Sequence, residues 1–193
     1  ERVALPERGP VEALDRQVLP ERARERLVAV GRHPGDRLVA YDALTYAGNR
    51  ANLTALAGHA GFRFVHADIR DTALVTRLLR EESVDTIVHF AAESHVDRSI
   101  TDPQAFIETN VVGTLVMLQA ALTHWTSLPR ERSEHFRFHH VSTDEVYGSI
   151  ASGSWNESEP VKPNSPYSAS KASSDLLALS YYKTYGFNVV VTK

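Results

Sequence analysis

The sequence predicts an α/β fold in which helices cover both faces of a doubly wound parallel sheet. From about residue 37 onward, short apolar runs alternate with segments of helical periodicity, and this alternation is typical of such a sheet. Acidic, hydroxyl or small residues follow the apolar runs directly, among them Asp42, Asp68, Ala91 and Thr143. Because ligands bind at the carboxyl ends of parallel strands, these positions predict a ligand site.

Each element has boundary signals of its own. The predicted strands cover residues 38–41, 62–66, 86–90, 138–141 and 188–192. One predicted helix begins after the N-cap Asp71, a second begins at Pro103, and a third runs from Pro166 to about Tyr185. Gly186 suits the end of the third helix.

Two segments fall outside this alternation. Residues 149–166 are rich in Ser, Gly, Pro and Asn, and they predict an exposed loop over the site. Residues 1–36 are dense in Arg, Glu and Pro, whereas a doubly wound dinucleotide-binding fold begins with an apolar strand and a G-x-G-x-x-G loop. Residues 1–36 are therefore atypical, because they lack the expected glycine-rich loop.

Composition narrows the class of protein. With 193 residues the chain can bury one sizeable core, so we expect a single domain over residues 1–193. A formal net charge of -3 without a basic block indicates neither nucleic acid nor a membrane surface as partner. No apolar run reaches the roughly 20 residues of a membrane span. The lack of Cys excludes disulfides and zinc–thiolate sites, and we expect a cytoplasmic protein without a bound metal.

Groups that transfer protons follow the fourth predicted strand. Thr143, Asp144 and Glu145 stand in a row, and one carboxyl of the pair can stay protonated as an acid while the other acts as a base. Two solvated loop acids are the alternative. Tyr167 and Lys171 lie one turn apart on the third predicted helix, where an ammonium beside the phenol favours the phenolate. The alternative is a Tyr and a Lys on the helix surface, which would show the same spacing. Thr143 favours the site, because its hydroxyl can share a proton network with Tyr167 and Lys171.

Two acids follow the first two predicted strands and suit a dinucleotide. Asp42 can accept both hydroxyls of an adenosine ribose and would repel the 2′-phosphate of NADP. Asp68, which precedes Ile69, can pair with an adenine amino group. A cap or turn acid is the alternative in both cases.

The residues after the third predicted strand suit a cofactor and a substrate. Ala91 and Ala92 are small enough for the backbone to approach a planar cofactor closely, and Ser94 and His95 could then face the substrate. A structural role is the alternative for His95. Lys171 could also reach ribose hydroxyls of a cofactor.

These residues belong to longer runs that resemble the dTDP-glucose 4,6-dehydratases, a group of extended short-chain dehydrogenases/reductases. The resemblance covers residues 37–193. Its matching runs are DALTYAGN at 42–49, ADIRD at 67–71, HFAAESHVDRS at 89–99, FIETN at 106–110, STDEVYG at 142–148 and YSASK at 167–171. The run TYAGN together with TDEVYG is highly specific, since sugar epimerases of the same superfamily usually lack the Asp-Glu pair.

The resemblance implies a Rossmann-like domain that holds NAD as a prosthetic group. The cofactor-binding residues that it implies are Asp42, Ala43, Leu44, Thr45, Asp68, Ile69, Phe90, Ala91, Ala92, Ser94, Thr109, Tyr167 and Lys171. It also implies that Ser94 and Thr143 touch the nucleotide sugar, and that a homodimer forms through helices at 103–124 and 167–185.

The resemblance further implies a reaction, the dehydration of dTDP-glucose to a 4-keto-6-deoxy sugar nucleotide. Tyr167 would take the proton of the 4-hydroxyl, Glu145 would remove the proton at carbon 5, and Asp144 would protonate the departing 6-hydroxyl. The family continues with a C-terminal substrate domain that these residues do not include. We therefore expect the chain as given to bind NAD weakly and to turn over little substrate. Another sugar-nucleotide enzyme, such as a 4-epimerase or a different 4,6-dehydratase, and an inactive remnant are the alternatives.

Overall fold

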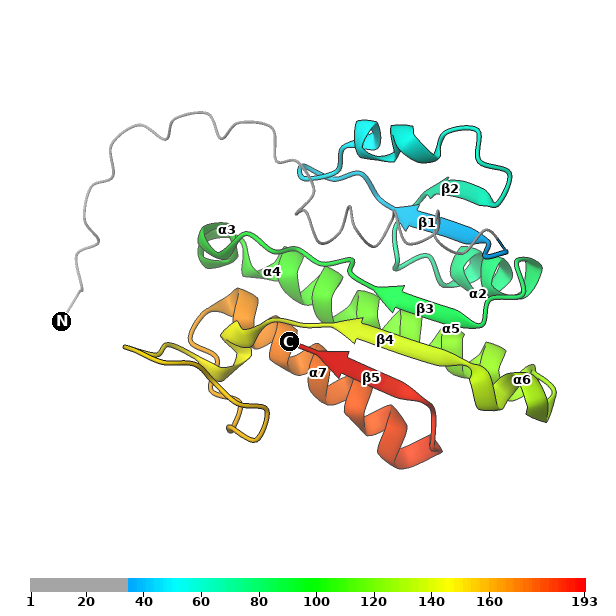
Figure 1. The fold of residues 1–193 in the computed structure, drawn as a ribbon. Coiled ribbons are helices and arrows are strands. Elements are labelled where there is room, and N and C mark those ends of the chain that lie inside the picture. The colour runs from blue at the N-terminus through cyan, green and yellow to red at the C-terminus, as the bar shows by residue number, and fades with distance from the viewer. Residues whose placement is uncertain (1–34) are drawn as a thin grey trace. The chain divides into compact units, whose positions relative to one another are not determined.

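The strands of this protein pair in parallel, in two separate groups. The structure is a computed structural model that describes residues 35–193. Its strands are β1 (Leu38–Asp42), β2 (Phe62–His66), β3 (Thr86–His89), β4 (Arg137–Val141) and β5 (Val189–Thr192). β1 pairs with β2, and β3, β4 and β5 form a second sheet in that order (Figure 1). The predicted α/β class with Rossmann-like parallel strands is confirmed, and each strand lies within one residue of its predicted bounds.

The chain divides between Ala67 and Asp68 into two compact units. In the first unit, Leu38 pairs with Phe62 and Asp42 pairs with His66 at the two ends of the β1–β2 ladder. The 3-10 helix η1 (Arg50–Leu56) follows β1. The predicted single domain over residues 1–193 stays a prediction.

The second unit contains the helices. They are α2 (Thr72–Glu81), α3 (Val96–Thr101), α4 (Pro103–Phe106), the π-helical segment η2 (Ile107–Gly113), α5 (Thr114–Ser127), α6 (Arg130–His135), the 3-10 turn η3 (Asp144–Tyr147) and α7 (Pro166–Tyr185). Asp71 and Gly186 lie at the helix ends where the sequence predicts them. Asp71 caps α2 by accepting a hydrogen bond from Leu74 N at 3.0 Å, and α7 ends at Gly186 in the left-handed conformation.

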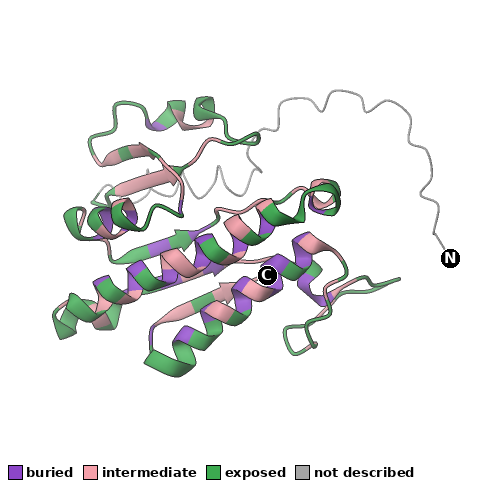
Figure 2. Ribbon diagram, turned by 180° about the vertical axis from the view of Figure 1, so that it is seen from behind, coloured by how far each residue is buried: buried purple, intermediate pink, exposed green. Residues whose placement is uncertain are grey.

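Helices α5 and α7 lie on one face of the β3–β4–β5 sheet, as both views show (Figures 1 and 2). The chain moves across this sheet in one direction, and right-handed crossovers then place successive helices on the same side. Ile87 and Phe138 point into this side and are 7% and 0% exposed. On the opposite side, Val88 and Val190 are exposed, so among the described residues of this unit the sheet carries helices on one face.

An aromatic cluster anchors the end of the sheet that lies far from the predicted site. Phe136, Phe138 and Phe187 are fully buried, and Trp125 packs edge-on against Phe187 with ring centroids 5.5 Å apart. The segment Pro103–Ser127 is long and apolar enough to cross a membrane by composition alone. We interpret it as a core helix of this unit, because it packs against α2 and α7.

Candidate functional site

The end of β4 presents the predicted proton-transfer residues in one turn. Thr143 is extended and caps η3, and its Oγ1 accepts a hydrogen bond from Glu145 N at 3.3 Å. The same Oγ1 donates to Asp144 Oδ1 at 3.4 Å. Gly148 ends the turn at φ 88, and a side chain there would collide with the carbonyl of Lys162. The turn therefore holds the hydroxyl and both carboxylates together at the carboxyl end of the strand.

Tyr167 and Lys171 face this turn from the start of α7. Ser165 and Ser168 form a capping box, and Pro166 occupies the first turn, so the sequence fixes where the helix begins. Tyr167 is 9% exposed and packs edge-on against Phe106, with ring centroids 6.3 Å apart. Its hydroxyl hydrogen-bonds with Thr143. The structure thus brings the predicted catalytic residues of β4 and α7 to one place.

The electrostatics of Tyr167 differ from the sequence expectation. Burial raises the pKa of the Tyr167 phenol above its ordinary value. A hydrogen bond with Thr143 lowers this pKa, whereas the charges of Glu145 and Asp144 raise it further. Lys171 is not among the groups that shift this pKa, and its Nζ donates to Val141 O at 2.8 Å. Burial lowers the pKa of Lys171 to about 8. In this structure the phenol is therefore protonated at neutral pH.

The pKa of Glu145 is raised, mainly by burial and further by the negative charge of Asp144. A carboxylate with a raised pKa binds a proton more readily, so Glu145 is better suited to act as a base near neutral pH than an ordinary solvated acid. Which carboxyl of the pair acts as the acid and which as the base stays a prediction.

The residues after β3 are held by a buried amide that sequence reasoning did not single out as functional. Asn110, 1% exposed in η2, accepts from Glu93 N at 2.7 Å and donates to Glu93 O at 2.9 Å. Its Nδ2 also lies 2.8 Å from Ser170 Oγ on α7. This arrangement fixes the segment that contains Ala91 and Ala92 against α7. The run FIETN at 106–110, which ends at Asn110, was the signal available in the sequence.

Ser94 and His95 lie at the start of α3. Ser94 is exposed, which suits a residue that faces a ligand. His95 is the N-cap of α3, and its Nδ1 accepts from Arg98 N at 3.4 Å. The structure thus gives His95 a structural role, and its predicted contact with substrate stays a prediction.

Asp68 and Ile69 begin the second unit. Arg70 grips the Asp68 carboxylate through three contacts of 2.7–3.1 Å, and its side-chain hydrogen bond lowers the pKa of Asp68. Arg70 Nη1 also donates to Glu108 at 3.0 Å, beside the half-buried Thr109. Ile69 packs against Gly113. A Cβ atom added to Gly113 would lie 2.5 Å from Cδ1 of Ile69, so this close contact requires a glycine.

The predicted adenosine-side residues lie in the first unit. Asp42 is exposed at the end of β1, and its Oδ1 accepts from Leu44 N at 2.7 Å. Leu44 has a positive φ of 48, and Ala43 O contacts His66 Nε2 at 3.0 Å. Thr45 O accepts from Gly48 N. The predicted atypical segment, residues 1–36, lies outside the described residues except for its last two positions.

Comparison with known proteins gives consistent relatives. Residues 25–193 match the family model described as GDP-mannose 4,6 dehydratase. The dTDP-glucose 4,6-dehydratase of Xanthomonas campestris pv. campestris (strain B100) is 56% identical over 167 residues, which is 86% of this chain and 47% of that protein. The dTDP-glucose 4,6-dehydratase of Streptomyces antibioticus is 53% identical over 84% of this chain and 44% of its own length. The chain thus spans about half the length of the curated relatives it matches.

Solved structures agree with this pattern. DesIV, a dTDP-glucose 4,6-dehydratase from Streptomyces venezuelae with NAD and TYD bound, superposes with a TM-score of 0.77 at 52% identity, over 88% of this chain and 50% of that chain. The UDP-glucose 4-epimerase of Thermus thermophilus, in complex with NAD, superposes with a TM-score of 0.70 at 30% identity, over 86% of this chain and 48% of that chain.

Proposed function

Since the chain belongs to the NAD-dependent epimerase/dehydratase family of extended short-chain dehydrogenases/reductases, we propose that it forms the NAD-binding half of a dTDP-glucose 4,6-dehydratase. The observation that carries this proposal is the acid pair at the end of β4. Asp144 and Glu145 stand beside Thr143 and Tyr167, so an acid and a base are available where the sugar would be oxidised. A 4-epimerase needs no such pair, because it eliminates no water.

The residues of the site have distinct roles in the proposed reaction. Tyr167, hydrogen-bonded with Thr143, takes the proton of the 4-hydroxyl in its phenolate form. Burial disfavours this form in the structure, and the positive charge that bound NAD would bring beside the phenol would favour it. Glu145 removes the proton at carbon 5, which the neighbouring 4-keto group makes acidic, and its raised pKa suits that step. Asp144 donates a proton to the 6-hydroxyl, which leaves as water. Lys171 holds a positive charge beside the reacting groups.

The residues present suit NAD. Ala91 and Ala92 have small side chains, so a planar cofactor ring can approach the backbone after β3 closely. Asn110 holds this segment in place through its two hydrogen bonds with the backbone of Glu93. Asp42 is exposed at the end of β1, where a carboxylate can accept ribose hydroxyls. When bound, NAD would supply the hydride chemistry, in which carbon 4 would lose a hydride, carbon 6 would regain it, and Glu145 would return its proton to carbon 5. We assign the remaining predicted cofactor residues to the same role.

We also propose a homodimer, as the helices at 103–124 and 167–185 predicted. Leu176, Leu179 and Tyr182 are 60%, 42% and 56% exposed on α7. Ile107 and Val112 of η2 are also exposed. Exposed apolar side chains at helical spacing are typical of a surface that packs against another chain.

Mass spectrometry of the product tests the proposed reaction. The full-length protein should convert dTDP-glucose to a product that is lighter by one water. A product of unchanged mass would indicate a 4-epimerase and would contradict the proposal, as would a protein that leaves dTDP-glucose unchanged.

A single variant tests the role of the acid pair. Glu145→Gln should still oxidise carbon 4 but should lose the elimination, so the sugar should lose two hydrogens and keep its 6-hydroxyl. Glu131→Gln, an exposed acid at the other end of the sheet, should behave like the unmodified protein. Undiminished loss of water by Glu145→Gln would overturn the assignment of Glu145 as the base.

A further inference from the structure

Asp175 is a buried carboxylate that the proposed reaction does not use. It lies one helical turn after Lys171 on α7 and is 1% exposed. An ionised carboxylate in such a place is costly unless other groups compensate for it. Its surroundings therefore indicate what it does.

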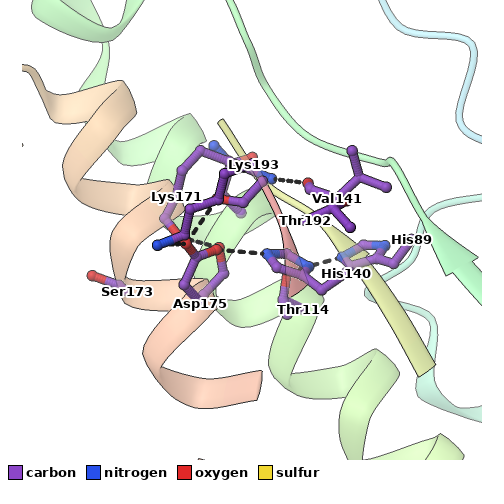
Figure 3. Close-up of polar contacts among 12 residues, drawn as sticks. His89, Thr114, His140, Val141, Lys171, Ser173, Asp175, Thr192 and Lys193 are labelled. Carbon is purple, nitrogen blue, oxygen red and sulfur yellow. Dashed lines mark hydrogen bonds and ion pairs between the residues drawn. The ribbon is translucent and has the colours of Figure 1, made fainter. Parts of the chain in front are cut away.

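The partners of Asp175 come from the ends of two strands. Ser142 Oγ, directly after β4, donates to Asp175 Oδ2 at 2.8 Å. His140 Nε2 of β4 lies 3.2 Å from Asp175 Oδ1 without the geometry of a hydrogen bond. Lys193 Nζ, directly after β5, lies 3.7 Å from Oδ2 and also sits 4.4 Å from the centre of the Tyr147 ring. Figure 3 shows His140 and Lys193 beside the Asp175 carboxylate.

Lys171 contacts the same stretch of β4. Its Nζ donates to Val141 O at 2.8 Å, between the two residues that approach Asp175. Val141 and Ser142 therefore hydrogen-bond with Lys171 and Asp175 on consecutive turns of one helix, and His140 lies beside Asp175. Lys171 and Asp175 together fix the position of α7 along the direction of β4, and therefore the position of Tyr167.

We propose that Asp175 is the positioning residue for Lys171: it binds α7 to the ends of β4 and β5 and supplies the negative charge that keeps the buried ammonium protonated. This inference rests on the proposed function, in which Lys171 acts as a cation beside Tyr167. It assigns no contact between Asp175 and the substrate.

The charges around the pair support this role. Burial lowers the pKa of Lys171 to about 8, and the charge of Asp175 opposes that shift. Burial also lowers the pKa values of His140 and His89, and the charge of Lys171 lowers both further, so both rings are neutral at neutral pH. The ionisable groups that interact with the pair are His89 on β3, His140 on β4, Tyr167 on α7 and Lys193 after β5. Asp144 and Glu145 on η3 act on Tyr167, and Tyr147 on η3 contacts Lys193.

The titration of Lys171 tests the proposal without any substrate. The chain contains four lysines, Lys162, Lys171, Lys183 and Lys193, so the signals of ¹³C-labelled lysine side chains can be assigned with Lys171→Arg. In Asp175→Asn, which keeps the size of the side chain, the amine of Lys171 should lose its proton at a lower pH than in the unmodified protein. Glu131→Gln removes the same charge from the exposed surface and should leave the titration in place.

Kinetics of the full-length protein supply the second readout. In Asp175→Asn the alkaline limb of the kcat profile should move to lower pH, with kcat at pH 8 reduced by about tenfold, since each pH unit changes a charged fraction by up to tenfold. KM for dTDP-glucose should change little. A merely structural role would lower stability and leave the limb in place, and that result would overturn the proposal.

A third variant keeps the proposal testable if Asp175→Asn does not fold. Ser142→Ala removes one hydrogen bond from the carboxylate and leaves its charge, so kcat should fall while the titration of Lys171 stays in place. An unchanged kcat would overturn the positioning role. If Lys171 titrates as expected but the unmodified full-length protein forms no dehydrated product, the proposed function fails and the charge coupling between Asp175 and Lys171 stands.

Discussion

Helices α2 and α7 belong to the same unit and bury opposite kinds of side chain. On α2, Val75, Leu78 and Leu79 are buried at the helical spacing expected of an apolar stripe, and Arg77 and Arg80 are exposed. This helix follows the ordinary rule for a surface helix. Its sequence therefore needs only a core to pack against, and it carries no group that the proposed reaction uses.

On α7 the arrangement is inverted. The buried residues include Ser170, Lys171, Ser174 and Asp175, whereas the exposed residues include Leu176, Leu179, Tyr182 and Tyr185. Each buried polar group needs a hydrogen-bond or charge partner, because its burial otherwise costs free energy. A group of exposed apolar side chains is typical of a surface that packs against another molecule. The difference suggests that α7 serves two proposed contacts, the proposed site on one side and the proposed dimer interface on the other.

The largest effect should come from the polar side of α7. Tyr167→Phe removes the hydroxyl that takes the first proton and should lower kcat by about 10²- to 10⁴-fold, the range of general acid–base catalysis. Turnover of dTDP-glucose by the full-length protein measures it. Tyr181→Phe removes a hydroxyl from the same helix, outside the site, and should leave kcat nearly unchanged. Equal decreases in kcat for the two variants would contradict the assignment of Tyr167 to the proposed site.

The sequence predicted the elements well because their signals are local. Asp71, Pro103, Pro166 and Gly186 act at helix ends within one turn of their own position, and the strands were evident as apolar runs. The row from Thr143 to Glu145 was also found in the sequence, since a strand end is visible there.

The inverted helix α7 could not be predicted in the same way. Asn110 meets Ser170 across 60 residues and Ser142 meets Asp175 across 33, so neither partner is visible near the other in the sequence. The same long-range packing turned Lys171 toward Val141 O, which the spacing of Tyr167 and Lys171 did not indicate. Which polar residues are buried depends on contacts between distant elements, and periodicity within one helix does not contain them.

The apolar side of α7 should respond to an added charge. In Leu179→Lys, an ammonium placed in the proposed dimer contact should weaken association by about 3 kcal/mol or more, as expected of an uncompensated buried charge. Light scattering coupled to size-exclusion chromatography should then show a monomer. Ala73→Lys adds the same charge to the exposed side of α2 and should leave a dimer. A dimeric Leu179→Lys protein would place the interface elsewhere.

Acid should destabilise the polar core beneath α7. The pKa values of His89 and His140 are lowered in the folded state, chiefly by burial, so below their ordinary value near 6.5 the unfolded chain binds more protons than the folded one. Stability should therefore fall as pH drops through that range, by at most about 1.4 kcal/mol per pH unit for each ring. Urea unfolding between pH 7.5 and 5.5 measures the slope.

A pair of histidine variants assigns that slope. His89→Gln keeps a side chain that can meet Thr114, which His89 Nε2 contacts at 2.9 Å, and removes one of the two titrating rings, so the slope should fall by about half. His135→Gln changes an exposed ring and should leave the slope as it was. A stability that is flat between these pH values in the unmodified protein would show that the two rings take up protons without unfolding.

The smallest effect should come from the outer side of α2. Arg77 Nε lies 3.8 Å from Glu81 Oε1, and both side chains are half exposed, at 58% and 50%. Because water already solvates both charges, Glu81→Gln should change the free energy of unfolding by about 0.5 kcal/mol or less, and less still in high salt. Asp175→Asn makes the same chemical change on the inner side of α7, where Ser142 and two neighbouring strand ends depend on the carboxylate. Urea unfolding of the two variants therefore compares the buried face of α7 with the exposed face of α2. A much larger decrease in the free energy of unfolding for Asp175→Asn supports the difference between the two helices. Equal decreases would mean that the buried carboxylate of α7 contributes no more to stability than a surface charge on α2.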